Sequence, residues 1–240
     1  MTNRQIVVKE LPQGTLEQSH FELQDARTPV PAEGEVLLRT ILISIDAANR
    51  SWMQGATYRD AVKAGDVMAT YSICEVMASN TPHIAVGDIV AAESVWADYV
   101  TRPARKVQKL PKVDVLSHLI SVYGIAGKTA FHGLISVGKP IAGETVVVSA
   151  AAGSVGGYVG QIAKALGCHV VGIAGGPEKC KWVVDHLGFD ACVDYRAGGL
   201  FKSLRAACPN GIDVYFDNVG GSVLEATLAL MNEKGRIACC

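Results

Sequence analysis

The fold is decided by the stretch Thr145-Val-Val-Val-Ser-Ala-Ala-Ala-Gly153-Ser-Val-Gly156-Gly-Tyr-Val-Gly160-Gln-Ile-Ala-Lys164. Its β-branched run at 146–148 predicts a strand that is buried on both faces. Glycines follow, and apolar residues then recur at helical spacing. Strand, glycine turn and helix in this order are typical of a dinucleotide-binding corner, where backbone N–H groups at the start of the helix approach a pyrophosphate. Because the spacing departs from the strict G-x-G-x-x-G, a turn that merely joins a strand to a helix is the alternative.

Downstream of this corner, strands and helices alternate regularly. We expect further strands at 168–174, 191–195 and 212–217 and from 236 onward, with helices at 178–187, 200–207 and 222–231. This alternation predicts an α/β fold with a doubly wound parallel (Rossmann) sheet. Such folds usually have six strands. The sequence stops inside the fifth, so we expect an apparently truncated sheet and a longer parent protein.

Upstream of this corner, the sequence follows a different pattern of predicted elements. Residues 4–110 contain short extended runs separated by turns, which predict a small barrel-like β domain. Helical spacing begins at 117–123 and continues at 128–137. We therefore expect a first domain at 1–123 and a dinucleotide-binding domain at 124–240.

The composition is that of an ordinary globular protein. The 240 residues carry a formal net charge of -1, which gives no electrostatic reason to expect nucleic acid or an anionic membrane as a partner. We find no secretory signal and no apolar run of membrane-spanning length. The 7 cysteines are scattered without C-x-x-C pairs, which argues against a disulfide framework or a structural zinc site and favours a cytoplasmic location.

The end of the second predicted strand indicates which dinucleotide is bound. A site for NAD usually has Asp or Glu there, to accept a hydrogen bond from the ribose 2′-hydroxyl. Here Gly175 and Gly176 take that place and Lys179 follows, so the sequence favours NADPH over NADH. The alternative is that Glu178 and Lys179 simply begin a solvated helix.

Two further polar residues follow predicted strands. Tyr195 ends the third strand, where it would hydrogen-bond the phosphate, line the adenine pocket or simply pack at the edge. Asn218 follows the fourth strand, in the crevice where ligands bind, and its amide can hold a ribose. A turn in which Asn218 caps the next helix is the alternative.

Taken in order, the motifs of the second half resemble the medium-chain dehydrogenase/reductase superfamily. Within it the chain resembles the zinc-independent prostaglandin reductase and curcumin reductase group. The motifs are Gly124-Ile-Ala-Gly127-Lys-Thr129-Ala-Phe-His-Gly133, 150–156, Gly160-Gln-Ile-Ala-Lys164, 171–180 and Phe216-Asp-Asn-Val-Gly-Gly221.

This resemblance implies a GroES-like first domain and an NADPH-dependent, zinc-independent enzyme that holds no metal. The implied reaction reduces the C=C bond of α,β-unsaturated ketones or aldehydes, with hydride delivered to the β carbon. The substrate would be a small-molecule enone, and a homodimer is common in such relatives. The implied cofactor contacts are Gly153, Ser154, Val155 and Gly156 for the pyrophosphate, Lys179 and Tyr195 for the 2′-phosphate, Asn218 for a ribose and Thr129 near the nicotinamide.

The sequence departs from the group near the expected substrate pocket. Ala48 stands where the relatives have a tyrosine, and Ile125-Ala126 replaces a Met-Pro pair. No catalytic residue is assigned. The competing functions are an NADPH quinone reductase and, from another class, a catalytically silent NADPH-binding protein or a truncated product.

Overall fold

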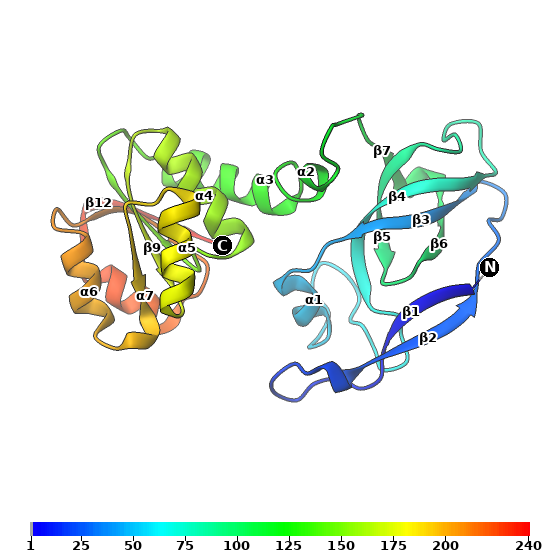
Figure 1. The fold of residues 1–240 in the computed structure, drawn as a ribbon, viewed down its shortest axis with the longest axis horizontal. Coiled ribbons are helices and arrows are strands. Elements are labelled where there is room, and N and C mark those ends of the chain that lie inside the picture. Colours follow the sequence, from blue (N-terminus) through cyan, green and yellow to red (C-terminus); the bar gives the residue numbers. More distant parts are fainter. Residues whose placement is uncertain (1) are drawn as a thin grey trace. The chain divides into compact units, whose positions relative to one another are not determined.

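The computed structural model describes residues 2–240, which form two compact units divided between Ile120 and Ser121. The second unit begins three residues before the expected boundary at residue 124. Figure 1 shows the order of the elements along the chain.

The first unit is an antiparallel β structure. Five strands form an open sheet in the order β6-β3-β4-β5-β7, and β1 and β2 form a separate ribbon beside it. The half-barrel encloses a core that includes Val36, Leu38 and Val76. The bounds are β1 Thr2–Val8, β2 Phe21–Arg27, β3 Glu35–Ile43, β4 Ala69–Ser79, β5 Ile89–Val95, β6 Tyr99–Pro103 and β7 Val107–Lys109, with the short helices η1 Gln18–His20, α1 Ala47–Trp52, η2 Ala104–Lys106 and α2 Ser117–Ile120.

The second unit is built on a parallel sheet in the order β10-β9-β8-β11-β12. This order confirms the doubly wound fold expected from the sequence. The strands are β8 Thr145–Ser149, β9 His169–Ala174, β10 Ala191–Asp194, β11 Ile212–Asp217 and β12 Met231–Cys239. The helices are α3 Ile125–Phe131, η3 His132–Gly138, α4 Ser154–Ala165, α5 Pro177–Leu187, η4 Tyr195–Ala197, α6 Leu200–Ala207 and α7 Gly221–Leu228.

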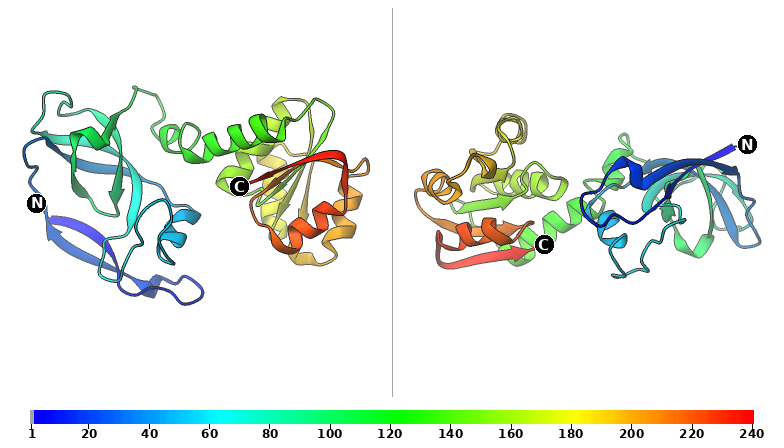
Figure 2. Two further views of the ribbon diagram at one scale, coloured as in Figure 1. Left: turned by 180° about the vertical axis from the view of Figure 1, so that it is seen from behind. Right: turned by 90° about the horizontal axis from the view of Figure 1, so that it is seen from below.

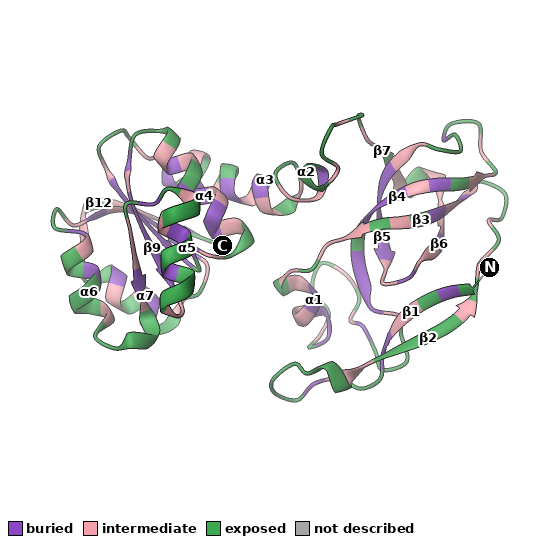
Figure 3. Ribbon diagram, in the orientation of Figure 1, coloured by how far each residue is buried: buried purple, intermediate pink, exposed green. Residues whose placement is uncertain are grey.

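Helices cover both faces of this sheet (Figure 2). Val146 and Val148 of β8 belong to the core beneath α3, η3, α4 and α5, while Val147 belongs to the core beneath α6 and α7. All five residues of β8 are buried. In Figure 3 the purple of buried residues is concentrated in the strands of this unit, and the green of exposed residues lies mostly on its helices. The apolar run of β8 is therefore explained by burial on both faces.

Three features of the elements differ from the sequence prediction. The helix expected to reach residue 231 ends at Leu228, and β12 begins at Met231 rather than at 236. The pairing of β12 with β11 shifts register between Ile212 and Val214, so β12 carries extra residues there. The helix expected over 128–137 is split, with α3 ending at Phe131 and the wider π-helical turns of η3 following.

No helix within residues 2–240 is both long enough and apolar enough to cross a membrane.

Candidate cofactor and active site

The glycine-rich corner that we expect to bind the pyrophosphate lies between β8 and α4. Gly153 is the N-cap of α4 and no side chain caps the helix. The first intrahelical bond is donated by Gly157 to Gly153, so the N–H groups of Ser154, Val155 and Gly156 lie ahead of it and need outside partners. A Cβ on Gly156 would lie 2.4 Å from the Ala150 carbonyl oxygen, so only glycine lets the helix start this close to the loop. Such a helix start attracts an anion.

Asn218 lies at the point where the strand order reverses, since β11 and β8 are neighbours although β9 and β10 intervene in sequence. Its side-chain Nδ2 donates to the Ser149 carbonyl at 2.8 Å, and its backbone N donates to Ser149 Oγ at 2.8 Å. Ligands of doubly wound sheets bind outside such a crossover. The side-chain nitrogen of Asn218 therefore already donates to Ser149. Its Oδ1 atom has no hydrogen bond within residues 2–240 and can accept one from a hydroxyl group.

The alternative in which Asn218 caps the next helix is wrong. Gly220 is the N-cap of α7, and no side chain caps it. Instead, the Asp217 carboxylate holds the turn by accepting from Gly220 N at 2.9 Å, Val219 N at 3.1 Å and the Tyr215 hydroxyl at 2.8 Å. Burial alone would raise the pKa of Asp217, but these donors lower the pKa below its usual value. The turn therefore keeps a charged carboxylate beneath Asn218.

The region that we expect to bind the adenosine end of the cofactor lies where β9 and β10 stop. Gly176 is the N-cap of α5 and Lys179 lies exposed in the first turn of that helix. Lys181 of the same helix is paired with Asp185, whereas Lys179 forms no ion pair within residues 2–240. The register pairs Asp194 with Ala174, so the residues after the two strands lie side by side. Asp194 Oδ1 accepts from Gly176 N at 2.8 Å and from Arg196 N at 2.9 Å, which fixes one turn against the other.

Tyr195 begins η4 directly after β10 and is 45% exposed. A Cβ on Gly175 would lie 3.0 Å from its hydroxyl oxygen and 2.9 Å from Arg196 Nε. The Arg196 guanidinium carbon lies 5.7 Å from the centre of the Tyr195 ring, and the interaction with the Tyr195 side chain raises the pKa of Arg196. Arg196 was not among the residues expected from the sequence. The only sign of Arg196 in the sequence is that it follows Tyr195 directly. Its contact with Gly175 depends on how β9 and β10 are paired, which the sequence does not show.

Thr129 lies half-buried on α3, a helix that packs against α4. All eight residues expected to contact the cofactor therefore belong to the second unit. The structure brings Lys179 and Tyr195 to the ends of adjacent strands and joins Asn218 to the end of β8.

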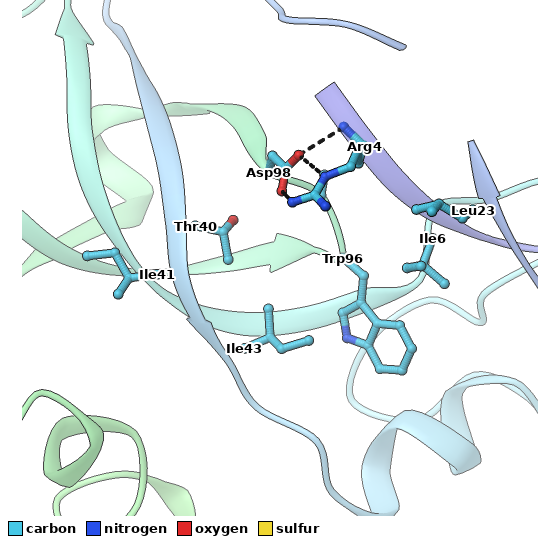
Figure 4. A pocket seen from close by; sticks show the side chains of 9 residues that line it. Arg4, Ile6, Leu23, Thr40, Ile41, Ile43, Trp96 and Asp98 are labelled. Carbon is cyan, nitrogen blue, oxygen red and sulfur yellow. Dashed lines mark hydrogen bonds and ion pairs between the residues drawn. The ribbon is translucent and has the colours of Figure 1, made fainter. Parts of the chain in front are cut away.

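The first unit has a pocket of its own, of about 340 Å³. Figure 4 shows Ile6, Ile41 and Ile43 lining it, with the Arg4–Asp98 ion pair at one end. Asp98 accepts from Arg4 Nε at 2.9 Å, and this bond lowers the pKa of Asp98. Asp46 caps α1 by accepting from Ala48 N. Both carboxylates thus have structural partners, and they form no acid–base pair.

Two family profiles match the chain, "N-terminal domain of oxidoreductase" over residues 4–110 and "Zinc-binding dehydrogenase" over 154–240. The chain is 42% identical to the NADPH-dependent curcumin reductase of Escherichia coli (strain K12), over 99% of this chain and 70% of that protein. The chain belongs to the zinc-independent reductase group of the medium-chain dehydrogenase/reductase superfamily.

The chain is also similar to other members of this superfamily. Prostaglandin reductase 1 of Bos taurus is 38% identical over 92% of this chain and 67% of its own length. The crystal structure of CurA in complex with NADPH from Vibrio vulnificus superposes with a TM-score of 0.91 at 42% identity, covering 98% of this chain and 70% of that one.

Within residues 2–240 of this reductase, no three His, Cys, Asp or Glu side chains come together as a metal site would require.

Proposed function

We propose that this reductase uses NADPH to reduce the C=C bond of α,β-unsaturated ketones or aldehydes. The observation that carries the proposal is the 42% identity to an NADPH-dependent curcumin reductase. Relatives named 2-alkenal reductase and (+)-pulegone reductase, at 36% and 34% identity, support the same substrate class. Curcumin, 2-alkenals and pulegone all contain a C=C bond conjugated to a carbonyl group.

The cofactor choice rests on charges at the adenosine end. Gly175 and Gly176 follow β9 where an NAD site would have a carboxylate. Lys179 and Tyr195 provide an ammonium and a hydroxyl for a 2′-phosphate. The N–H groups of Ser154, Val155 and Gly156 would bind the pyrophosphate, Gly153 would let it approach, Asn218 Oδ1 would accept from a ribose hydroxyl, and Thr129 would lie near the nicotinamide.

When bound, NADPH supplies the hydride, which is delivered to the β carbon of the enone. The role of this chain is to bind and orient the cofactor. No side chain of the described residues is assigned as an acid or base. Stabilisation of the enolate oxygen by a fixed hydrogen-bond donor is the general requirement of this chemistry.

Turnover with a panel of enones and quinones tests the function. We expect loss of NADPH absorbance with enones such as 2-alkenals and slower loss with quinones. Faster turnover of quinones would make the protein a quinone reductase. NADPH binding without turnover of either class would make it a catalytically silent NADPH-binding protein.

A further inference from the structure

Arg196 is an arginine without a carboxylate partner. Arg4 is paired with Asp98 and Arg236 with Glu144, but Arg196 forms no ion pair within residues 2–240. Asp194 lies close by, yet its Oδ1 atom accepts from two backbone N–H groups rather than from the guanidinium. The Arg196 side chain is exposed, and the nearby Asp194 carboxylate offsets its positive charge only in part.

The guanidinium is held at the end of β9. Its Nε atom lies 2.9 Å from the position of a Cβ on Gly175, next to the Tyr195 hydroxyl oxygen at 3.0 Å from the same point. The guanidinium carbon of Arg196 also lies 5.7 Å from the centre of the Tyr195 ring. These contacts place the group beside the glycine that replaces the carboxylate of an NAD site.

We propose that Arg196 binds the 2′-phosphate of NADPH together with Lys179 and Tyr195, and so determines cofactor specificity. This inference rests on the proposed function. A guanidinium carries several N–H donors in a fixed fork that matches two phosphate oxygens, while the Lys179 ammonium acts as a point charge. The contacts of the Arg196 side chain with Gly175 and the Tyr195 ring restrict the fork, which lowers the entropy lost when the phosphate binds.

Direct binding of nucleotide fragments tests this role without turnover. Adenosine 2′,5′-bisphosphate and 5′-AMP differ by the 2′-phosphate alone, and calorimetric titration of the whole chain gives a dissociation constant for each. We expect Arg196→Ala to weaken the bisphosphate about 10- to 100-fold and AMP less than about twofold. Arg196→Lys should recover part of the loss because it keeps the charge but not the fork. The control is Arg205→Ala, which removes an exposed arginine of α6 and should change neither constant.

Three outcomes would overturn the inference in different ways. Equal weakening of both fragments by Arg196→Ala would show that the side chain only supports the Gly175 turn. No weakening of either would remove Arg196 from the site. A wild-type chain that binds the bisphosphate no better than AMP would overturn the proposed cofactor choice itself. If Arg196→Ala lowers the melting temperature, Arg196→Gln decides the same question, because it keeps the stem and loses the charge.

Discussion

At the scale of a single residue, the space around Gly175 bears on whether the site would bind NADPH or NADH. A carboxylate at the end of β9 would occupy the space that the Tyr195 ring and Arg196 Nε hold, each 2.9 Å from the position of its Cβ. A Cβ contact below 3.0 Å forces a shift, and here the neighbours are side chains that can move. The acid of an NAD site and this Tyr–Arg pair therefore compete for the same space, and the pair would have to move to admit the acid.

This competition predicts the effect of Gly175→Asp. The new carboxylate displaces Tyr195 and Arg196, repels a 2′-phosphate and can accept from a free ribose 2′-hydroxyl. We expect the ratio of the NADPH and NADH affinities to fall about 10- to 100-fold, measured by titration of nicotinamide fluorescence. Gly55→Asp is the control, because no atom lies within 4 Å of a Cβ there. An unchanged ratio would contradict the steric argument.

Lys179→Ala tests the ammonium of the same site. We expect NADPH binding to weaken by about 1.5–3 kcal/mol, the value of a hydrogen bond to a charged group, with little effect on NADH. Lys181→Ala is the matched control on the same helix, since Lys181 is already paired with Asp185. Equal losses for both cofactors would remove Lys179 from the proposed role.

Sequence order and side-chain chemistry were sufficient to place Tyr195 directly after β10 and Lys179 in the helix that follows β9, but not to find Arg196. The strand–helix alternation fixes where β9 and β10 stop, and residues after a strand lie at the ligand edge of the sheet. The approach of Arg196 to Gly175 depends on the β9–β10 register, which pairs Ala174 with Asp194. A single sequence does not carry that register.

At the scale of elements, Arg236 ties β12 to the end of η3. Its guanidinium donates to the Gly138 carbonyl at 3.1 Å and to the Lys139 carbonyl at 3.0 Å, and it also binds both oxygens of Glu144. The bond from Arg236 lowers the pKa of Glu144, burial opposes this, and the Ile141 N–H adds to the lowering. The Arg236 side chain thus donates hydrogen bonds both to the carbonyl groups at the end of a helix, which lack partners within the helix, and to a carboxylate.

Arg236→Ala should lower the free energy of unfolding by about 1.5–3 kcal/mol at neutral pH, measured by urea denaturation. A carboxyl group with a lowered pKa stabilises the fold above its unfolded pKa of about 4.3, and this contribution is lost as the pH falls through the folded pKa. The difference between wild type and variant should therefore shrink in acid. Lys181→Ala, which breaks an exposed pair on α5, should cost less than about 0.5 kcal/mol. A pH-independent difference would show that only the carbonyl contacts matter.

The elements themselves followed from the sequence better than their packing did. Alternating apolar strands and helical spacing located β8 to β11, because burial on both faces leaves a distinct pattern. Gly160 is an example of a packing contact that the sequence pattern does not reveal. A Cβ there would lie 1.8 Å from the Phe189 ring, and the two residues are distant in sequence. The register shift that starts β12 early also arises from pairing rather than from local preference.

At the scale of the whole molecule, each unit buries its own core. The cores of the parallel sheet contain only residues from Ala130 onward, and those of the half-barrel only residues up to Ile120. Every residue proposed to contact the cofactor lies in the second unit. Cofactor binding and the pocket of the half-barrel are therefore built on separate folding units.

A fragment of residues 121–240 should accordingly fold and bind on its own. We expect cooperative urea unfolding, because the core is complete within the unit. We also expect a dissociation constant for adenosine 2′,5′-bisphosphate within about threefold of the whole chain, since less than 0.7 kcal/mol separates such values. Residues 1–120 expressed alone are the control and should not bind the bisphosphate. A fragment that unfolds cooperatively but fails to bind would show that the first unit contributes contacts to the adenosine end. A fragment that does not fold would show that the separate cores are insufficient without it.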